Sequence, residues 1–201
     1  MTQKQKTHHL AVADLLAAVA AVLQFVEFSI PIMPAFVKLD VSDLPALLGT
    51  FSLGPVYGIA IQLVKNLLHL PFGSSACVGE LSNFLLGATF AFIAGIIYKK
   101  HKNRSGALWG SVAGAAAMAL ISLPLNYFIV YPAYVVLYGL PLEGIVGMYE
   151  AILGTVAHVP TGNALFNCLL VFNVPFTLCK GLLDVALCFL IYKPLSPLLH
   201  K

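Results

Sequence analysis

The amino-acid sequence predicts an all-α membrane protein, a bundle of six transmembrane helices with an outward-facing ligand pocket capped by loops. Apolar residues make up 60% of the 201-residue chain and charged residues only 9%, whereas soluble domains are about one-quarter charged. The mean hydropathy is +0.92. The apolar residues fall into segments near the ~20 residues that a helix needs to cross a bilayer. We therefore expect one membrane domain over residues 1–201.

Three helices are predicted in the first third of the chain. Residues 9–30 form an apolar segment that runs past the length of a signal-peptide core, so we interpret it as the first membrane helix. Residues 44–53 form a short second helix, which must be tilted or capped by loops. Gly54 and Pro55 then turn the chain into a third helix over residues 56–70, because both residue types interrupt helices.

The rest of the chain predicts three further crossings. The fourth covers residues 79–98 and ends at the basic segment 99–104, and the fifth covers residues 107–130. Residues 132–172 are apolar but interrupted by prolines and glycines, so we expect short helices at the membrane surface or over the end of the bundle. The sixth crossing covers residues 174–192.

Basic residues cluster near the N-terminus, in segment 99–104 and near the C-terminus. Because lysine and arginine collect in cytoplasmic loops, this distribution predicts that both termini are cytoplasmic. The assignment depends on reading residues 44–70 as two helices, since one long helix would place segment 99–104 outside. Such clusters are typical of membrane loops, so we expect lipid contacts and no nucleic-acid partner.

A few polar residues stand inside apolar helices, where an ionisable group normally faces the bundle interior and has a partner. Lys180 has two interpretations: a donor to carbonyl or ring-nitrogen acceptors of a ligand, or an ion-pair partner of Glu80 or Asp184. Asn126 must find hydrogen-bond partners among helices or ligand. Tyr131 follows it in an aromatic cluster of the kind that also forms membrane belts.

Small residues recur every fourth position in the first helix, at Ala13, Ala17 and Ala21. Such a strip lets another helix approach closely, and it suits internal packing and an external partner equally.

Several motifs that carry chemistry are absent from the sequence. It has no phosphate-binding loop of the G-x-x-x-x-G-K-[ST] type and none of the common hydrolase or metalloprotease motifs. The four cysteines lack metal-ligand spacing, and we interpret them as buried apolar residues. We therefore expect no enzyme activity, no catalytic residue, no metal site and no cofactor.

Four sequence stretches, taken together in their order along the chain, are specific enough to indicate a protein family. They are FSIPIMP (28–34) with KLDVSDLPALLG (38–49), GPVYG (54–58) with KNLL (65–68), GE (79–80) with NFLLG (83–87), and PFTLCKG (175–181). Together they resemble the riboflavin-specific S components of energy-coupling-factor (ECF) transporters, over most of the chain.

The resemblance implies a six-helix subunit in the bacterial plasma membrane that captures riboflavin from outside. Riboflavin is then the transported substrate and not a cofactor. The expected partners are a transmembrane coupling subunit and two cytoplasmic ATPases, which supply the energy. In this family the small-residue strip of the first helix docks on the coupling subunit, which makes Ala13, Ala17 and Ala21 expected contacts.

The resemblance also implies which residues bind the flavin: a lid loop after the first helix, an asparagine on the fifth helix, and an asparagine and a lysine on the sixth. Asn126 and Lys180 match this pattern, but Thr177 stands where the family usually has the second asparagine. One hydrogen bond to the ring is then lost, moved to another residue, or made through water. The expected ligand-binding set is Leu39, Asp40, Glu80, Asn83, Asn126, Tyr131, Thr177 and Lys180.

Three alternatives remain open at this point. The chain can be an S component for another vitamin, such as thiamine or biotin. It can be a structural or assembly protein of the membrane whose polar residues pair internally. A membrane enzyme is the third alternative, although the sequence has no recognisable catalytic group.

Overall fold

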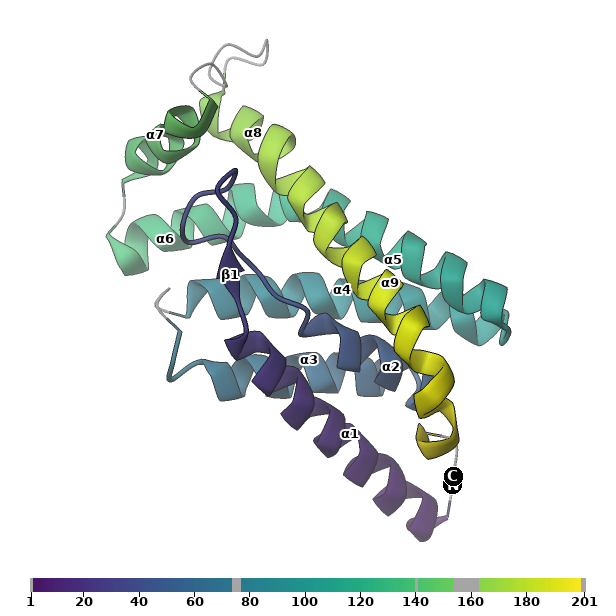
Figure 1. The fold of residues 1–201 in the computed structure, drawn as a ribbon. Helices are drawn as coiled ribbons and strands as arrows, with labels where there is room; N and C mark the ends of the chain where they lie inside the picture. Colours follow the sequence, from purple (N-terminus) through teal and green to yellow (C-terminus); the bar gives the residue numbers. More distant parts are fainter. Residues whose placement is uncertain (1, 74–76, 140, 154–162, 200–201) are drawn as a thin grey trace.

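The structure, a computed structural model, describes residues 2–73, 77–139, 141–153 and 163–199. These residues fold almost entirely into helices (Figure 1). The α-helices are α1 Gln3–Phe25, α2 Asp43–Leu53, α3 Pro55–His69, α4 Val78–Lys100, α5 Arg104–Leu125, α6 Tyr131–Tyr138, α7 Leu142–Leu153, α8 Ala164–Cys168 and α9 Val174–Leu199; two π-helical segments are η1 Asn126–Val130 and η3 Leu169–Asn173. A short antiparallel sheet pairs β1 Phe28–Ser29 with β2 Lys38–Leu39.

Four helical segments of the described chain are long and apolar enough to cross a membrane. They are Gln3–Phe25, Val78–Lys100, Arg104–Leu137 and Ala164–Ile191. The predicted all-helical membrane protein is confirmed, and so are the predicted second and third helices with their Gly54–Pro55 turn, although α2 and α3 are too short to count as spans by themselves. Six crossings therefore stay a prediction.

The fifth and sixth helices are longer than predicted. Proline was expected to interrupt the chain, but α5 continues through η1 into α6, and α8 continues through η3 into α9. Pro132 and Pro175 each follow a π-helical segment by two residues. Because proline lacks an N–H and its ring crowds the carbonyl of the preceding turn, a widened turn lets the helix continue. Only α7, within residues 132–172, matches the expected separate short helix.

The helix α2 is the centre of the bundle. It packs against α1, α3, α4 and α9, and nearly all its residues are buried, from Asp43 to Phe51. A short helix that is apolar on almost every side is stable only when other helices surround it. Its first residue, Asp43, is therefore carried into the interior of the bundle.

The helices α4 and α5 approach each other closely at two glycines. A Cβ atom at Gly110 would lie 2.8 Å from the carbonyl oxygen of Ala94, and one at Gly114 would lie 2.8 Å from that of Phe90. Gly110 and Gly114 are four residues apart and so share one helix face. This small-residue spacing allows backbone-to-backbone packing in the absence of side chains.

The alanine strip of α1 faces the interior. Ala13, Ala17 and Ala21 are 6%, 2% and 6% exposed, and the first two belong to an apolar cluster with Ala46 of α2 and Ile61 of α3. In this structure the strip is thus an internal packing face, which was one of its two interpretations. Docking of the strip on another subunit stays a prediction, and it would require α1 to separate from α2 and α3.

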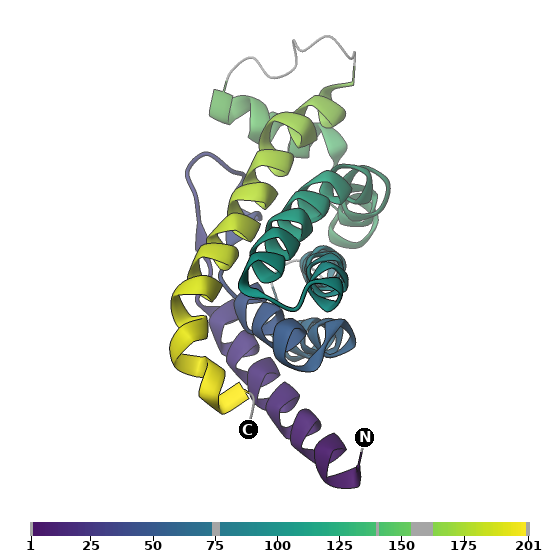
Figure 2. The same ribbon diagram turned by 90° about the vertical axis from the view of Figure 1, so that its right-hand side faces the viewer.

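The bundle has two distinct ends. In Figure 1, α1 begins and α9 ends at the lower right, and the α4–α5 turn lies at the right. The sheet, α7 and α8 lie toward the left and upper left, at the other end of these helices (Figures 1 and 2). The basic segment 99–104 therefore shares an end with both termini of the described helices, as the predicted topology requires.

We expect Gly114→Ala to lower the thermal unfolding midpoint of the detergent-purified protein. The added methyl group meets the backbone of α4 at 2.8 Å, and overpacking of this kind costs about 1–3 kcal/mol. Gly147→Ala in α7 is the control, because no heavy atom lies within 4 Å of its added Cβ. Equal midpoints for the two variants would contradict the close contact.

Candidate functional site

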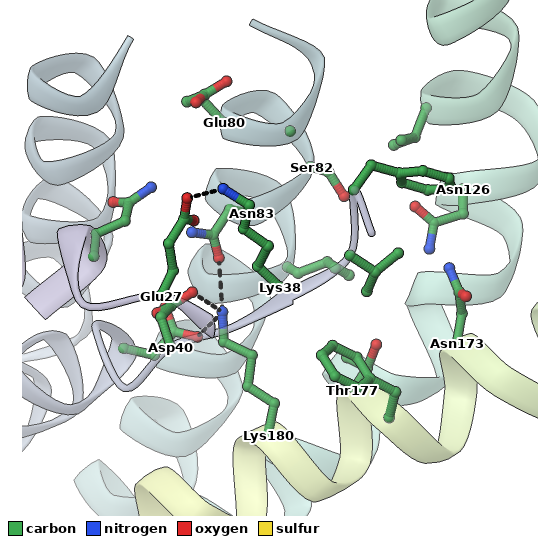
Figure 3. A pocket seen from close by; sticks show the side chains of 18 of the residues that line it. Glu27, Lys38, Asp40, Glu80, Ser82, Asn83, Asn126, Asn173, Thr177 and Lys180 are labelled. Atoms are coloured by element: carbon green, nitrogen blue, oxygen red, sulfur yellow. Dashed lines mark hydrogen bonds and ion pairs between the residues drawn. The ribbon is translucent and has the colours of Figure 1, made fainter. Parts of the chain in front are cut away.

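A cavity lies between the helices in the half of the bundle that contains the sheet. Its lining includes Gln24 from the last turn of α1, His69 at the end of α3, and Glu80 and Asn83 from the first turns of α4. The junction of α5 with α6 and the beginning of α9 complete the wall, and the segment between α1 and α2 passes over it (Figure 3).

The structure brings seven of the eight predicted ligand residues together around this cavity. They are Asp40, Glu80, Asn83, Asn126, Tyr131, Thr177 and Lys180. The eighth, Leu39, is not among the lining residues, whereas its neighbours Lys38 and Asp40 are. Leu39 pairs with Phe28 in the sheet, and successive residues of a strand point to opposite faces.

Lys180 forms the charged floor of the cavity. Its Nζ donates to Asp40 Oδ2 at 2.9 Å and to Asn83 Oδ1 at 3.2 Å, and it lies 3.6 Å from Asp43 Oδ2. Figure 3 shows this ammonium group reaching from α9 toward the loop and α4. Of the two interpretations of Lys180, the ion pair with Glu80 or Asp184 is wrong in its partners, which are Asp40 and Asp43. A contact between Lys180 and a ligand stays a prediction.

A second lysine extends this network below the cavity. Lys65 Nζ donates to Asp43 Oδ1 at 2.5 Å and to Ser42 Oγ at 2.7 Å. The Ser42 backbone N–H in turn donates to Asp40 Oδ1 at 2.8 Å. Lys65 is 0% exposed, so its ammonium group lies inside the bundle and does not reach the lipid headgroups. The two lysines and two aspartates tie α2, α3, α9 and the loop together.

The electrostatic balance keeps the loop carboxylate ionised. Burial raises the pKa of the Asp40 carboxyl, but the ammonium groups of Lys180 and Lys65 together lower it further. Its pKa therefore lies below the ordinary value for aspartate. Asp184, one turn beyond Lys180 on α9, is 0% exposed, and its two oxygens have no hydrogen-bond partner among the described residues.

Two further side chains contact carboxylates around the cavity. His69 Nδ1 lies 3.0 Å from Glu80 Oε1, and Lys38 on β2 forms an ion pair with Glu27, just after α1. The second pair fastens the returning strand of the loop to the end of α1. Each cationic side chain named here thus faces a carboxylate, which favours an uncharged ligand over an anionic one.

Two buried polar side chains in the lining, Asn126 and Thr177, form no side-chain hydrogen bond in the described part of the chain. Asn126 is 5% exposed and Thr177 is 6% exposed. Within the described part of the chain, neither the Asn126 amide nor the Thr177 hydroxyl has a hydrogen-bond partner. Buried polar groups are normally satisfied. These two therefore present donors and acceptors to whatever occupies the cavity.

Asn173 is a lining residue that the sequence analysis missed. Its Oδ1 accepts a hydrogen bond from the Tyr149 hydroxyl at 2.5 Å, and its Nδ2 donates to the Tyr131 hydroxyl at 3.1 Å. The two tyrosine hydroxyls are themselves 2.5 Å apart. The spacing of four between Asn173 and Thr177 could have revealed it, but the predicted sixth helix began at residue 174, whereas the continuous helix begins at Ala164.

Aromatic rings form the apolar part of the wall. Phe36 lies with its ring centroid 5.4 Å from that of Tyr134 and 6.2 Å from that of Tyr131, and all three residues line the cavity together with Phe176. A wall of rings with a few convergent polar groups suits a flat, largely apolar molecule that has a polar edge. Among the described residues, no cluster of three or more His, Cys, Asp or Glu side chains is placed to hold a metal ion.

Comparison with known proteins gives a consistent family. A profile described as "ECF transporter, substrate-specific component" matches residues 8–192. The chain is 32% identical over 197 residues to the riboflavin transporter RibU of Staphylococcus aureus (strain TCH60), across 98% of this chain and 95% of the relative. It is 29% identical over 201 residues to the riboflavin transporter FmnP of Bacillus subtilis (strain 168), across 98% of this chain and 96% of the relative.

The fold agrees with this family as well. A solved structure described as the S component of a bacterial ECF transporter matches with a TM-score of 0.74 and 32% identity, over 98% of this chain and 99% of that chain. The apolar helices place the protein in a membrane. On the sequence match and the shared fold, this chain belongs to the substrate-specific components of ECF transporters, which are transport subunits and not enzymes.

Proposed function

We propose that this chain binds riboflavin at the cavity described above and passes it inward as the substrate-specific subunit of an ECF transporter. The observation that carries the proposal is the pair of buried side chains without a side-chain hydrogen bond, Asn126 and Thr177, in a wall that also carries aromatic rings and paired charges. The two relatives compared above, both riboflavin transporters, support the same ligand.

Riboflavin suits this wall chemically. Its isoalloxazine ring system is flat and largely apolar, with a polar pyrimidine edge, and its ribityl chain carries hydroxyl groups. The aromatic residues Phe36, Tyr131 and Tyr134 match the ring, and Asn126 matches its polar edge. Asp40, Glu80 and Asn83 are the proposed partners of the ribityl hydroxyls. Leu39 has no contact in this proposal beyond its place in the lid.

Binding requires the cavity to open. Its volume is about 160 Å³, whereas ligand pockets usually measure roughly 300–1,000 Å³. The segment between α1 and α2 is the proposed movable part of the wall, because it carries no helix. The Lys38–Glu27 and Lys180–Asp40 ion pairs hold it in its present position. We propose that it acts as a lid that shifts outward when the flavin enters.

The orientation follows from charge. With segment 99–104 and both termini in the cytoplasm, the cavity opens to the outside. Six crossings result if α2 and α3 together span the membrane twice as a short, buried pair. The chain has no nucleotide-binding motif, so the proposed partners are a transmembrane coupling subunit and two cytoplasmic ATPases.

Riboflavin binding can be measured directly. We expect purified protein to quench flavin fluorescence in a saturable way at micromolar or lower concentration, and we expect excess thiamine or biotin to leave the quenching unchanged. Saturable displacement by one of those vitamins would assign the chain to a different substrate. A lack of quenching at micromolar protein would remove the proposal altogether.

Asn126→Ala is expected to weaken riboflavin binding by about ten- to a hundredfold, because buried ring-edge groups lose their partner. Its thermal midpoint without ligand should change little, since the amide has no partner in the described protein. Ser122→Ala is the matched control on the same helix: Ser122 is buried, bonds only to its own helix at Ala119, and is outside the lining. Equal affinities of the two variants would contradict the role of Asn126.

The proposed orientation can be tested with a membrane-impermeant maleimide on intact cells. The interpretation of the four cysteines as buried is wrong for Cys77 and Cys179, which are exposed. Cys77 lies at the start of α4, on the side of the cavity, so in a Cys179→Ser background we expect it to react, and the further change Cys77→Ser to abolish the reaction. Lys102→Cys, placed in the background that carries both serine changes, should react only after the cells are permeabilised. The reverse pattern would show that the protein faces the other way.

A further inference from the structure

We propose that Asn173 is an additional ligand-binding residue, which gives the polar ring edge the amide contact that Thr177 cannot provide. This inference rests on the proposed riboflavin function and specifies which side chains of the same cavity recognise the isoalloxazine ring. It selects one of the three outcomes left open by the threonine: the hydrogen bond has moved to another residue of the same helix.

Position is the first argument. Asn173 and Thr177 are four residues apart at the beginning of the last long helix, so they lie on one face, one turn apart. Both line the cavity, and they are equally buried, each with 6% exposure. Figure 3 shows the Asn173 amide pointing across the cavity toward Asn126, and Thr177 lower on the same helix.

The second argument is that the amide is held in place. Asn173 Nδ2 donates to the Tyr131 hydroxyl, and the Tyr149 hydroxyl donates to Asn173 Oδ1. Since Tyr149 has one proton, the contact between the two hydroxyls must be a bond from Tyr131 to Tyr149. The three side chains thus form a closed ring of hydrogen bonds. Tyr149 is 0% exposed and lies outside the cavity lining, so it positions the amide from behind.

The third argument is the capacity that remains. A primary amide has two N–H donors and two acceptor lone pairs, and the ring uses one of each. One N–H and one lone pair of Asn173 are left for the cavity. Thr177 offers a single hydroxyl. A pyrimidine edge that alternates carbonyl, N–H and carbonyl is matched by two facing amides, Asn126 and Asn173, better than by one amide and a hydroxyl.

The π-helical segments explain how two asparagines meet. Asn126 is the first residue of η1 and Asn173 is the last residue of η3. Each widened turn lies beside the cavity, where it shifts the face that its helix presents to the interior. The two helices therefore each turn one amide toward the same space.

The test is a riboflavin titration of four variants. Asn173→Ala should weaken binding by about ten- to a hundredfold, while Thr177→Val, which keeps the shape of the side chain and removes one hydroxyl contact, should weaken it clearly less than Asn173→Ala does. In the double variant Asn173→Ala with Thr177→Asn, the amide returns to the neighbouring turn, and affinity should recover at least in part. Thr177→Asn alone serves as the reference for that recovery.

A second measurement separates a ligand contact from a merely structural role. Methylation of riboflavin at the ring N–H removes a donor and crowds the amide that faces it. We expect wild-type protein to bind 3-methylriboflavin much more weakly than riboflavin, and Asn173→Ala to discriminate clearly less. Tyr149→Phe, which loosens the amide without touching the cavity, should give an intermediate discrimination.

The outcomes are distinguishable. If wild-type protein fails to bind riboflavin, the proposed function and this inference both fall. If wild-type protein binds and Asn173→Ala binds equally well, or if Asn173→Ala discriminates against the methylated flavin as strongly as wild type, only this inference falls. A loss with Thr177→Val as large as that with Asn173→Ala would assign the contact to the threonine.

Discussion

Pairing of buried charge is the constraint on which the architecture depends. An ionised side chain in an apolar bundle is unfavourable by several kcal/mol unless an opposite charge and hydrogen bonds meet it. Lys65 and Lys180 come from helices distant in sequence, and Asp40 and Asp43 come from the loop and from α2. To satisfy all four groups, α2 must begin inside the bundle and the loop must lie across it. The position of the cavity follows, because its floor is this network.

The second feature that shapes the site is the pair of π-helical turns that precede Pro132 and Pro175. In water a proline would end most helices, but in a membrane the backbone groups it frees must be bonded within the protein. Pro132 and Pro175 are accommodated by η1 and η3, which widen the helix just before them. The same widening lies where the cavity needs polar groups. The same two π-helical turns therefore accommodate the prolines and place polar side chains at the cavity.

Hydropathy was sufficient to predict the helical membrane fold, and the Gly54–Pro55 turn was predicted correctly because glycine and proline act locally. The ends of the last two long helices were not predictable in this way, since continuation past Pro132 depends on a tertiary setting that permits a π-helical turn. Motif resemblance located seven residues of the cavity lining. It missed Asn173, whose spacing to Thr177 was a sequence signal but whose hydrogen bonds to Tyr131 and Tyr149 join three segments that are separated in the sequence.

The hydrogen-bonded ring of Asn173, Tyr131 and Tyr149 can be closed with the same number of bonds in either direction. If the amide turns over by 180° and both hydroxyl protons swing to their other neighbour, all three bonds reverse and none is lost. Donor and acceptor then exchange places at the cavity surface. The wall can therefore offer either order of donor and acceptor. A ligand ring whose donors and acceptors are exchanged, through tautomerism or a change of substituent, meets the same number of hydrogen-bond partners.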